Sequence, residues 1–217
     1  QKLGVAIVDV CTGQYAAMCI LAALKARTTT GRGQRVDLSL FNTSLSMLIN
    51  VASNYLIGGI IPARYGNGHP NIVPYRDYCC SDGEIAIAVG NDTQFERLAV
   101  ILGHPEWVED DRFRTNPDRV NNRKECDEMI RAALSSRTAD QWIELFQKEG
   151  IPCSKINTVE DVLNSEQAKE NNMIVEMPHS ALGSIKTLGV PYSFSQTPAS
   201  VQLPPPELGQ HTGEILT

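Results

Sequence analysis

The sequence predicts a mixed α/β protein, in which a first α/β segment is followed by a smaller α+β domain. Three observations support this class. Residues 14–26 are rich in alanine and leucine and predict a helix, whereas residues 35–40 alternate apolar and polar side chains as a strand does. Residues 75–90 resemble a β-hairpin and precede several helical patterns. With 217 residues the chain can hold one large or two small domains.

The first expected helix, residues 14–26, is apolar on nearly every face, so we expect it to be buried against several neighbours. Its most apolar part, residues 15–24, is too short to span a bilayer and is followed by Lys25 and Arg27. Threonines and glycines in residues 28–33 then predict a turn. The sequence therefore predicts a core helix that ends near residue 27.

The next segment predicts a strand, a helix and a long connection. Val36, Leu38 and Leu40 alternate with polar residues in the two-residue period of a half-buried strand. Residues 42–56 predict a second helix. Glycines and prolines crowd residues 58–74, which is the composition of an irregular connection, and we expect a domain boundary inside it.

The smaller domain is expected to begin with a hairpin over residues 75–90, whose turn contains Asp82 and Gly83. Three helices are expected over residues 93–102, 120–135 and 139–149. The last has the clearest start, because Thr138 and Gln141 fit a capping box.

A second capping pattern, formed by Thr158 and Asp161, predicts a short helix. Residues 173–177 and 184–188 then read as two strands that complete the smaller domain near residue 190. The tail, residues 191–217, is rich in proline and is expected to run extended over a surface.

Composition limits the classes of partner. The formal charge of −6 argues against nucleic acid or an anionic membrane as a partner, because both select clustered lysine and arginine. The six cysteines lack a C-x-x-C spacing, which indicates neither a zinc site nor a disulfide framework. We therefore expect an intracellular protein, cytoplasmic or mitochondrial, that binds small metabolites and holds no metal.

Asp9 is the first candidate functional residue, because it interrupts the apolar run GVAIVDVCTG just ahead of the first expected helix. An Asp in this place is most often an N-cap whose carboxylate accepts a backbone N–H. The alternative is a nucleophile, since the helix dipole favours an ionised carboxylate that can attack a reactive acyl group. Composition does not separate the two readings.

The segment GVAIVDVCTGQYAAMCILAALKARTTTGRGQRVDLSL resembles the region around the active-site Asp of the class III CoA-transferases, the CaiB/BaiF family. Five further fragments are similar to that family in the same order: RYGNGHPNIVPY, SDGEIAIAVGNDTQF, RFRTNPDRVNNR, GIPCSKINTVEDV and PPPELGQHTGEIL. The similarity extends over almost the whole chain and corresponds to most of the carboxy-terminal half of that family. The branch that moves CoA between succinate and glutarate-like dicarboxylates is the most similar.

The resemblance implies a division into parts. Residues 1–57 would belong to the large Rossmann-like domain that carries the nucleophile. Residues 58–74 would form a linker and lid loop, and residues 75–190 the small α+β domain. Residues 191–217 would be an extended connection that returns to the large domain.

The resemblance also implies a reaction and its participants. CoA would pass from an acyl-CoA such as succinyl-CoA to a free carboxylic acid of the dicarboxylic class, through an aspartyl-CoA thioester on Asp9. No tightly bound cofactor is implied, because coenzyme A and acyl-CoA are substrates. An interlocked homodimer is the assembly that the family implies.

The substrate contacts implied by the resemblance lie in three places. A glycine-containing loop would close over the nucleophile and contact substrate, and its members here are Gly66, Asn67, Gly68 and His69. Asn91 and Asp92 stand where the family's second substrate-contacting motif is found, and Leu40 where the family contacts CoA.

Three points stay open at this stage. Asp92 is equally well read as a helix cap, and His69 as a general base is the less favoured reading of that residue. His211 is expected to be structural and to hold the extended tail in place. Two other functions also remain: an acyl-CoA racemase or isomerase of the same family, or an inactive unit that serves only assembly or ligand binding.

Overall fold

The structure of the chain, a computed structural model, describes residues 4–217 and contains both helices and strands, which confirms the mixed fold class. It divides into two compact units, Gln1–Ser154 and Lys155–Thr217. The division reflects where the residues of each unit contact one another most. The expected domain limits at residues 57, 74 and 190 stay predictions.

The first helix, α1, spans Ile7–Thr30 and is longer at both ends than the expected helix. Ala6 is its N-cap residue and makes no side-chain cap, so Asp9 lies inside the first turn and the N-cap reading of Asp9 is wrong. Gly31 ends the helix with a φ of 68° and donates its N–H to the Arg27 carbonyl, which is the left-handed C-cap that glycine favours. The turn that follows the helix is therefore set by Gly31.

None of the residues of α1 is buried in the described part of the chain, so the expectation of a buried helix is wrong. Its exposed apolar side chains include Met18 and Leu21, which are 62% and 68% exposed. The physical reason is that α2 is its main neighbour, which leaves most of its circumference uncovered. With 24 residues, α1 is also long and apolar enough to cross a membrane, a criterion that core helices of soluble proteins meet too.

Two short helices follow, α2 at Leu40–Ser46 and α3 at Ile49–Leu56. The strand expected over residues 35–40 does not form, because no strand of the described chain pairs with this segment. The Ser39 hydroxyl instead accepts the Asn42 N–H at 3.1 Å, which starts α2 at Leu40. The single helix expected over residues 42–56 is interrupted before Ile49, whose φ is +48°.

The hairpin forms as predicted. Strands β1, Tyr75–Cys79, and β2, Glu84–Ala88, are antiparallel, and Tyr75 lies opposite Ala88 in the register. The Cys80 N–H donates to the Gly83 carbonyl at 2.7 Å and closes the turn. Strand β3, Cys153–Lys155, lies on the other side of β2.

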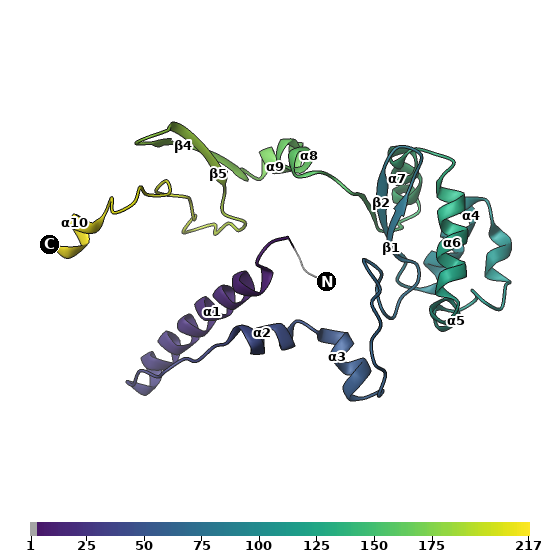
Figure 1. Cartoon of the computed structure of the whole chain (residues 1–217), viewed down its shortest axis with the longest axis horizontal. Coiled ribbons are helices and arrows are strands. Elements are labelled where there is room, and N and C mark those ends of the chain that lie inside the picture. Colours follow the sequence, from purple (N-terminus) through teal and green to yellow (C-terminus); the bar gives the residue numbers. More distant parts are fainter. Residues whose placement is uncertain (1–3) are drawn as a thin grey trace. The chain divides into compact units, whose positions relative to one another are not determined.

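Helices cover this hairpin, and Figure 1 shows α4, α6 and α7 gathered beside it. Their bounds are Asp92–Leu102 for α4, Arg123–Leu134 for α6 and Ala139–Lys148 for α7; a 3₁₀ turn, η1, spans Pro105–Val108 and α5 spans Asn116–Asn121. The helix expected over residues 120–135 forms as α6, whereas α5, which ends just before it, was not predicted. The capping box of Thr138 and Gln141 is confirmed.

The core of the first unit lies between the hairpin and these helices. Its fully buried members come from both, which is the arrangement that buries the apolar face of each element. They include Tyr78, Ile85, Ile87, Phe95, Leu98, Phe113, Ile130, Leu134 and Phe146.

The second unit begins with two short helices, α8 at Val159–Asn164 and α9 at Glu166–Glu170. The capping box of Thr158 and Asp161 is confirmed at the start of α8. The two expected strands form the antiparallel pair β4, Ile174–His179, and β5, Gly183–Leu188. The tail is irregular as predicted, except for the short helix α10, Thr212–Leu216.

Candidate active site

Asp9 lies in the first turn of α1 with its side chain exposed. The N–H groups at the start of a helix and the helix dipole stabilise a negative charge in this turn. The Asp9 carboxylate makes no hydrogen bond or ion pair with any other residue of the range 4–217. Its carboxylate is therefore accessible and unengaged, as attack on an acyl group requires.

The glycine-containing segment is shaped by a tight turn after Tyr65. The Gly68 N–H donates to the Tyr65 carbonyl at 3.0 Å, and Gly66 has a φ of +62°, which favours glycine. A Cβ added at Gly68 would lie 3.1 Å from the Tyr65 carbonyl oxygen, closer than side-chain contacts usually are. Both glycines are therefore required by the path of this turn.

His69 is held in one orientation. Its ring stacks on that of Tyr75 with the centroids 5.2 Å apart, and its Nδ1 accepts the Asn71 N–H at 3.1 Å. Burial, together with the nearby Arg123 charge, lowers the pKa of His69 below its ordinary value of 6.5. An imidazole that accepts at Nδ1 carries its proton on Nε2, so this arrangement does not favour His69 as a general base.

Asn91 and Asp92 have different roles at the start of α4. The Asn91 side chain is the cap and accepts the Gln94 N–H at 2.9 Å. Asp92 is the first residue of the helix and its Oδ1 accepts a bond of 2.6 Å from Nη2 of Arg119. The reading of Asp92 as the helix cap is therefore wrong, because the side chain of Asn91 caps the helix.

The glycine-containing segment and the Asn91 motif meet at one end of the hairpin. The His69 N–H donates to the Tyr75 carbonyl at 2.9 Å, at the start of β1. The Val89 N–H donates to the Pro74 carbonyl at 3.0 Å, just after β2 and just before Asn91. Both motifs therefore lie at the end of the hairpin opposite its turn, and the structure brings together these two of the three predicted contact regions.

The remaining predicted residues lie on the first two helices. Leu40 is the first residue of α2 and its side chain is half exposed. Neither Leu40 nor Asp9 makes a hydrogen bond to the open end of the hairpin in the described range. Their place relative to that end stays a prediction.

The sequence interpretation missed the residues that hold the glycine-containing segment. Nη2 of Arg123 donates to the Pro70 carbonyl at 2.9 Å, and its guanidinium lies 4.9 Å from the centre of the Tyr65 ring. The Asn71 side chain exchanges two hydrogen bonds with that of Asn54 on α3. Arg119 and Arg123 both occur in the fragment RFRTNPDRVNNR, where arginine beside a buried helix face was the available signal.

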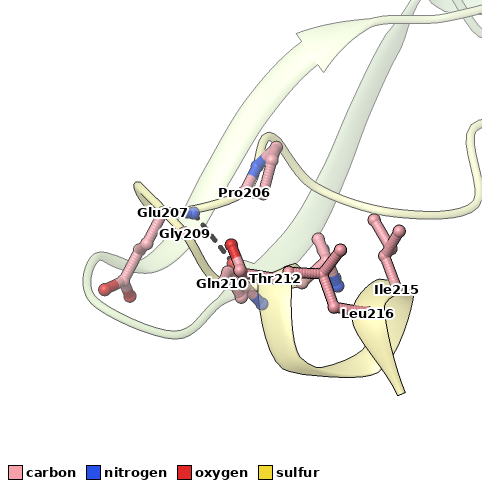
Figure 2. Close-up of a pocket in the computed structure, with 8 residues that line it drawn as sticks. Pro206, Glu207, Gly209, Gln210, Thr212, Ile215 and Leu216 are labelled. Atoms are coloured by element: carbon pink, nitrogen blue, oxygen red, sulfur yellow. Dashed lines mark hydrogen bonds between the residues drawn. The ribbon is translucent and has the colours of Figure 1, made fainter.

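Two hollows lie near predicted residues. One, of about 470 Å³, is lined by Tyr65, Arg76, Arg123 and their neighbours, and therefore borders the glycine-containing segment. The other, of about 360 Å³, is formed by Pro206–Leu216 in the second unit, and Figure 2 shows the bond from the Glu207 N–H to the Gln210 side chain beside it. His211 lines this second hollow and contacts Glu214 at 3.3 Å, within its own helical turn.

The described residues, 4–217, contain no group of three or more His, Cys, Asp or Glu side chains that could hold a metal ion. The six cysteines are free thiols. Burial raises the pKa of the Cys80 thiol to about 11 and that of Cys126 to about 12, so neither is a ready nucleophile near neutral pH.

Comparison with known proteins gives one consistent result. The model of CoA-transferase family III matches residues 1–212. The chain is 39% identical over 213 residues to the succinyl-CoA:glutarate CoA-transferase of Mus musculus, covering 98% of this chain and 49% of that protein. It is 34% identical over 216 residues to the succinate–glutarate CoA-transferase of Agrobacterium fabrum, covering 100% of this chain and 54% of that protein.

A solved structure shows the same relationship. A CAIB/BAIF family protein from Brucella suis is similar with a TM-score of 0.77 at 38% identity. The match covers 100% of this chain and 56% of that one. The chain spans about half the length of the curated relatives it matches.

Proposed function

Since the chain belongs to CoA-transferase family III, we propose that it supplies the nucleophile and the substrate-contacting small unit of an enzyme that transfers CoA. The donor is an acyl-CoA such as succinyl-CoA and the acceptor is a free dicarboxylic acid. Two relatives are named as CoA-transferases that act on succinate or succinyl-CoA and glutarate, which supports this substrate class. The observation that carries the proposal is the exposed, unengaged Asp9 in the first turn of α1.

The proposed reaction proceeds by two exchanges at Asp9. The carboxylate attacks the acyl-CoA thioester, which gives a mixed anhydride and releases CoA thiolate; the thiolate then attacks the aspartyl carbonyl and releases the donor acid. The acceptor carboxylate attacks the resulting aspartyl-CoA thioester, and the same two steps run in reverse. One thioester is exchanged for another, so the overall reaction is nearly balanced in free energy.

The glycine-containing segment is the proposed source of hydrogen bonds to the oxyanions of these steps. The N–H groups of Gly68 and His69 are already bonded to the carbonyls of Tyr65 and Tyr75. Within the described range, those of Gly66 and Asn67 donate to no acceptor, and both residues are exposed. Gly66 and Asn67 are therefore the donors that we assign to this role.

The surroundings of the second motif favour transfer over racemisation. Besides Asp9, a racemase needs a second carboxylate or imidazole group that is free to exchange a proton with the substrate. Asp92 is ion-paired with Arg119, and Nδ1 of His69 already accepts a hydrogen bond. These groups are occupied, so we propose CoA transfer as the function.

We propose that the enzyme forms a homodimer. Its proposed location is intracellular, either cytoplasmic or mitochondrial. The uncovered apolar side chains of α1 support its packing against further protein, because an apolar area of this kind is seldom left in water. We propose no metal and no tightly bound cofactor.

The test uses the full-length enzyme that carries this sequence and measures exchange of labelled succinate into succinyl-CoA, with glutarate as the second acceptor. Asp9→Asn removes the nucleophile and is expected to lower kcat by at least about a thousandfold. Asp37→Asn is the matched control, because Asp37 is also an exposed aspartate and forms only a local ion pair with Arg35. Turnover of Asp9→Asn close to that of the control would refute the proposal.

A further inference from the structure

Arg119 makes hydrogen bonds through all three of its guanidinium nitrogens. It lies on α5 and is 0% exposed, yet it carries a full charge. Its Nε donates to the Val73 carbonyl and its Nη1 to the Phe113 carbonyl, each at 2.8 Å. Its guanidinium also lies 4.2 Å from the centre of the Phe95 ring. Such a buried cation is tolerated only because its donors are satisfied.

The carboxylate that balances this charge belongs to a predicted substrate-contacting residue. Nη2 of Arg119 donates to Oδ1 of Asp92 at 2.6 Å, although Asp92 itself is 51% exposed. The ion pair therefore joins a buried cation to an acid at the surface. Arg119 therefore holds the Asp92 carboxylate in place from the buried side.

The same guanidinium fixes the end of the glycine-containing connection. Val73 is completely buried, and its carbonyl accepts from Arg119 while its N–H donates to the Asn116 side chain at 3.1 Å. Asn116 also donates to the Asn71 carbonyl at 2.9 Å. Residues 71–73 are thus bonded to side chains of α5 through both N–H and carbonyl groups of their backbone.

Besides the nearby Phe113 and Arg114 carbonyls, the bonds of Arg119 reach two segments that are 27 and 46 residues away from it in the sequence. One of them carries Asn91 and Asp92, and the other follows Gly66–His69. Both segments meet at the open end of the hairpin.

We propose that Arg119 is a positioning residue that couples Asp92 to the glycine-containing segment, so that the two substrate-contacting motifs keep one fixed relation. The role of this coupling in catalysis rests on the proposed function, whereas the coupling itself does not. The coupling is a physical property of the chain and can be measured without any transferase activity.

The test substitutes Asp92, because replacing the buried Arg119 could unfold the chain. Amide hydrogen exchange is measured in the full-length protein for wild type, Asp92→Ala, Asp92→Asn and the control Glu96→Ala, an exposed acid one turn further along α4. In Asp92→Ala the Arg119 charge loses its partner, and the peptide covering residues 65–75 is expected to exchange about tenfold faster, as for one lost charged hydrogen bond. Asp92→Asn keeps an accepting oxygen and should restore most of the protection, while Glu96→Ala should leave this peptide unchanged.

A rise confined to α4, with residues 65–75 exchanging as in wild type, would overturn the coupling. In assays of CoA transfer by the full-length enzyme, Asp92→Ala is expected to have a lower kcat than wild type. Asp92→Asn is expected to recover part of this loss. If the enzyme shows no CoA transfer at all, the proposed function fails, whereas the exchange result still decides the coupling.

Discussion

Two aspartates at helix starts, Asp9 and Asp92, have opposite surroundings. Asp9 is exposed and unengaged in the described range, which leaves its carboxylate available for attack. Asp92 is bonded to a buried guanidinium at 2.6 Å, which makes it a fixed acceptor. The same residue type in a similar sequence position thus has two different surroundings, and we propose a different role for each.

The pH dependence of stability is expected to report on His69. Its pKa is lowered in the folded chain, first by burial and then by Arg123, so the unfolded chain binds more protons below pH 6.5. The contribution of His69 to the free energy of unfolding should therefore be fully present above pH 6.5 and should be lost as the pH drops below it. Urea unfolding at several pH values should show a shallower fall in His69→Gln, and an identical fall in the two proteins would contradict the assignment.

The positive φ of Gly66 predicts a cost for any side chain there. Alanine at a φ of +62° is strained by about 1 to 2 kcal/mol, so Gly66→Ala should distort the turn that presents the Gly66 and Asn67 N–H groups. We expect kcat for CoA transfer to fall about tenfold or more. Gly83→Ala is the control, because a Cβ at Gly83 meets no atom within 4 Å. Equal rates for the two variants would show that the turn does not matter to catalysis.

At the scale of elements, the sequence predicted best what is decided locally. The two capping boxes and the hairpin turn depend on residues within four positions of each other, and all three formed as expected. The strand over residues 35–40 failed, because alternation specifies a face but no partner strand. Arg119 was missed for the same reason, since its main partners lie 27 and 46 residues away.

The capping box of α7 gives a prediction of stability. The Thr138 hydroxyl accepts the Gln141 N–H, and the Gln141 side chain accepts the Thr138 N–H. Thr138→Ala removes the first bond and should lower the free energy of unfolding by about 1 kcal/mol, whereas Thr138→Ser keeps the hydroxyl. Urea unfolding measures the difference. Equal midpoints for the two variants would show that the cap contributes nothing.

At the scale of the whole molecule, the chain combines a well-packed core in the first unit with a long helix that the described residues do not cover. Composition predicted that α1 would be apolar but could not show what packs on it. The structure places the glycine-containing segment and the Asn91 motif together at one end of the hairpin. It leaves the approach of Asp9 to that end as a proposal, and this approach is what the proposed reaction requires.

The most direct test of the central claim is mass spectrometry of the full-length enzyme after incubation with succinyl-CoA and proteolysis. The account predicts a CoA adduct on the peptide that contains Asp9, formed by the wild type and absent from Asp9→Asn. Transfer of CoA with no adduct on that peptide, or with the adduct on another residue, would contradict it.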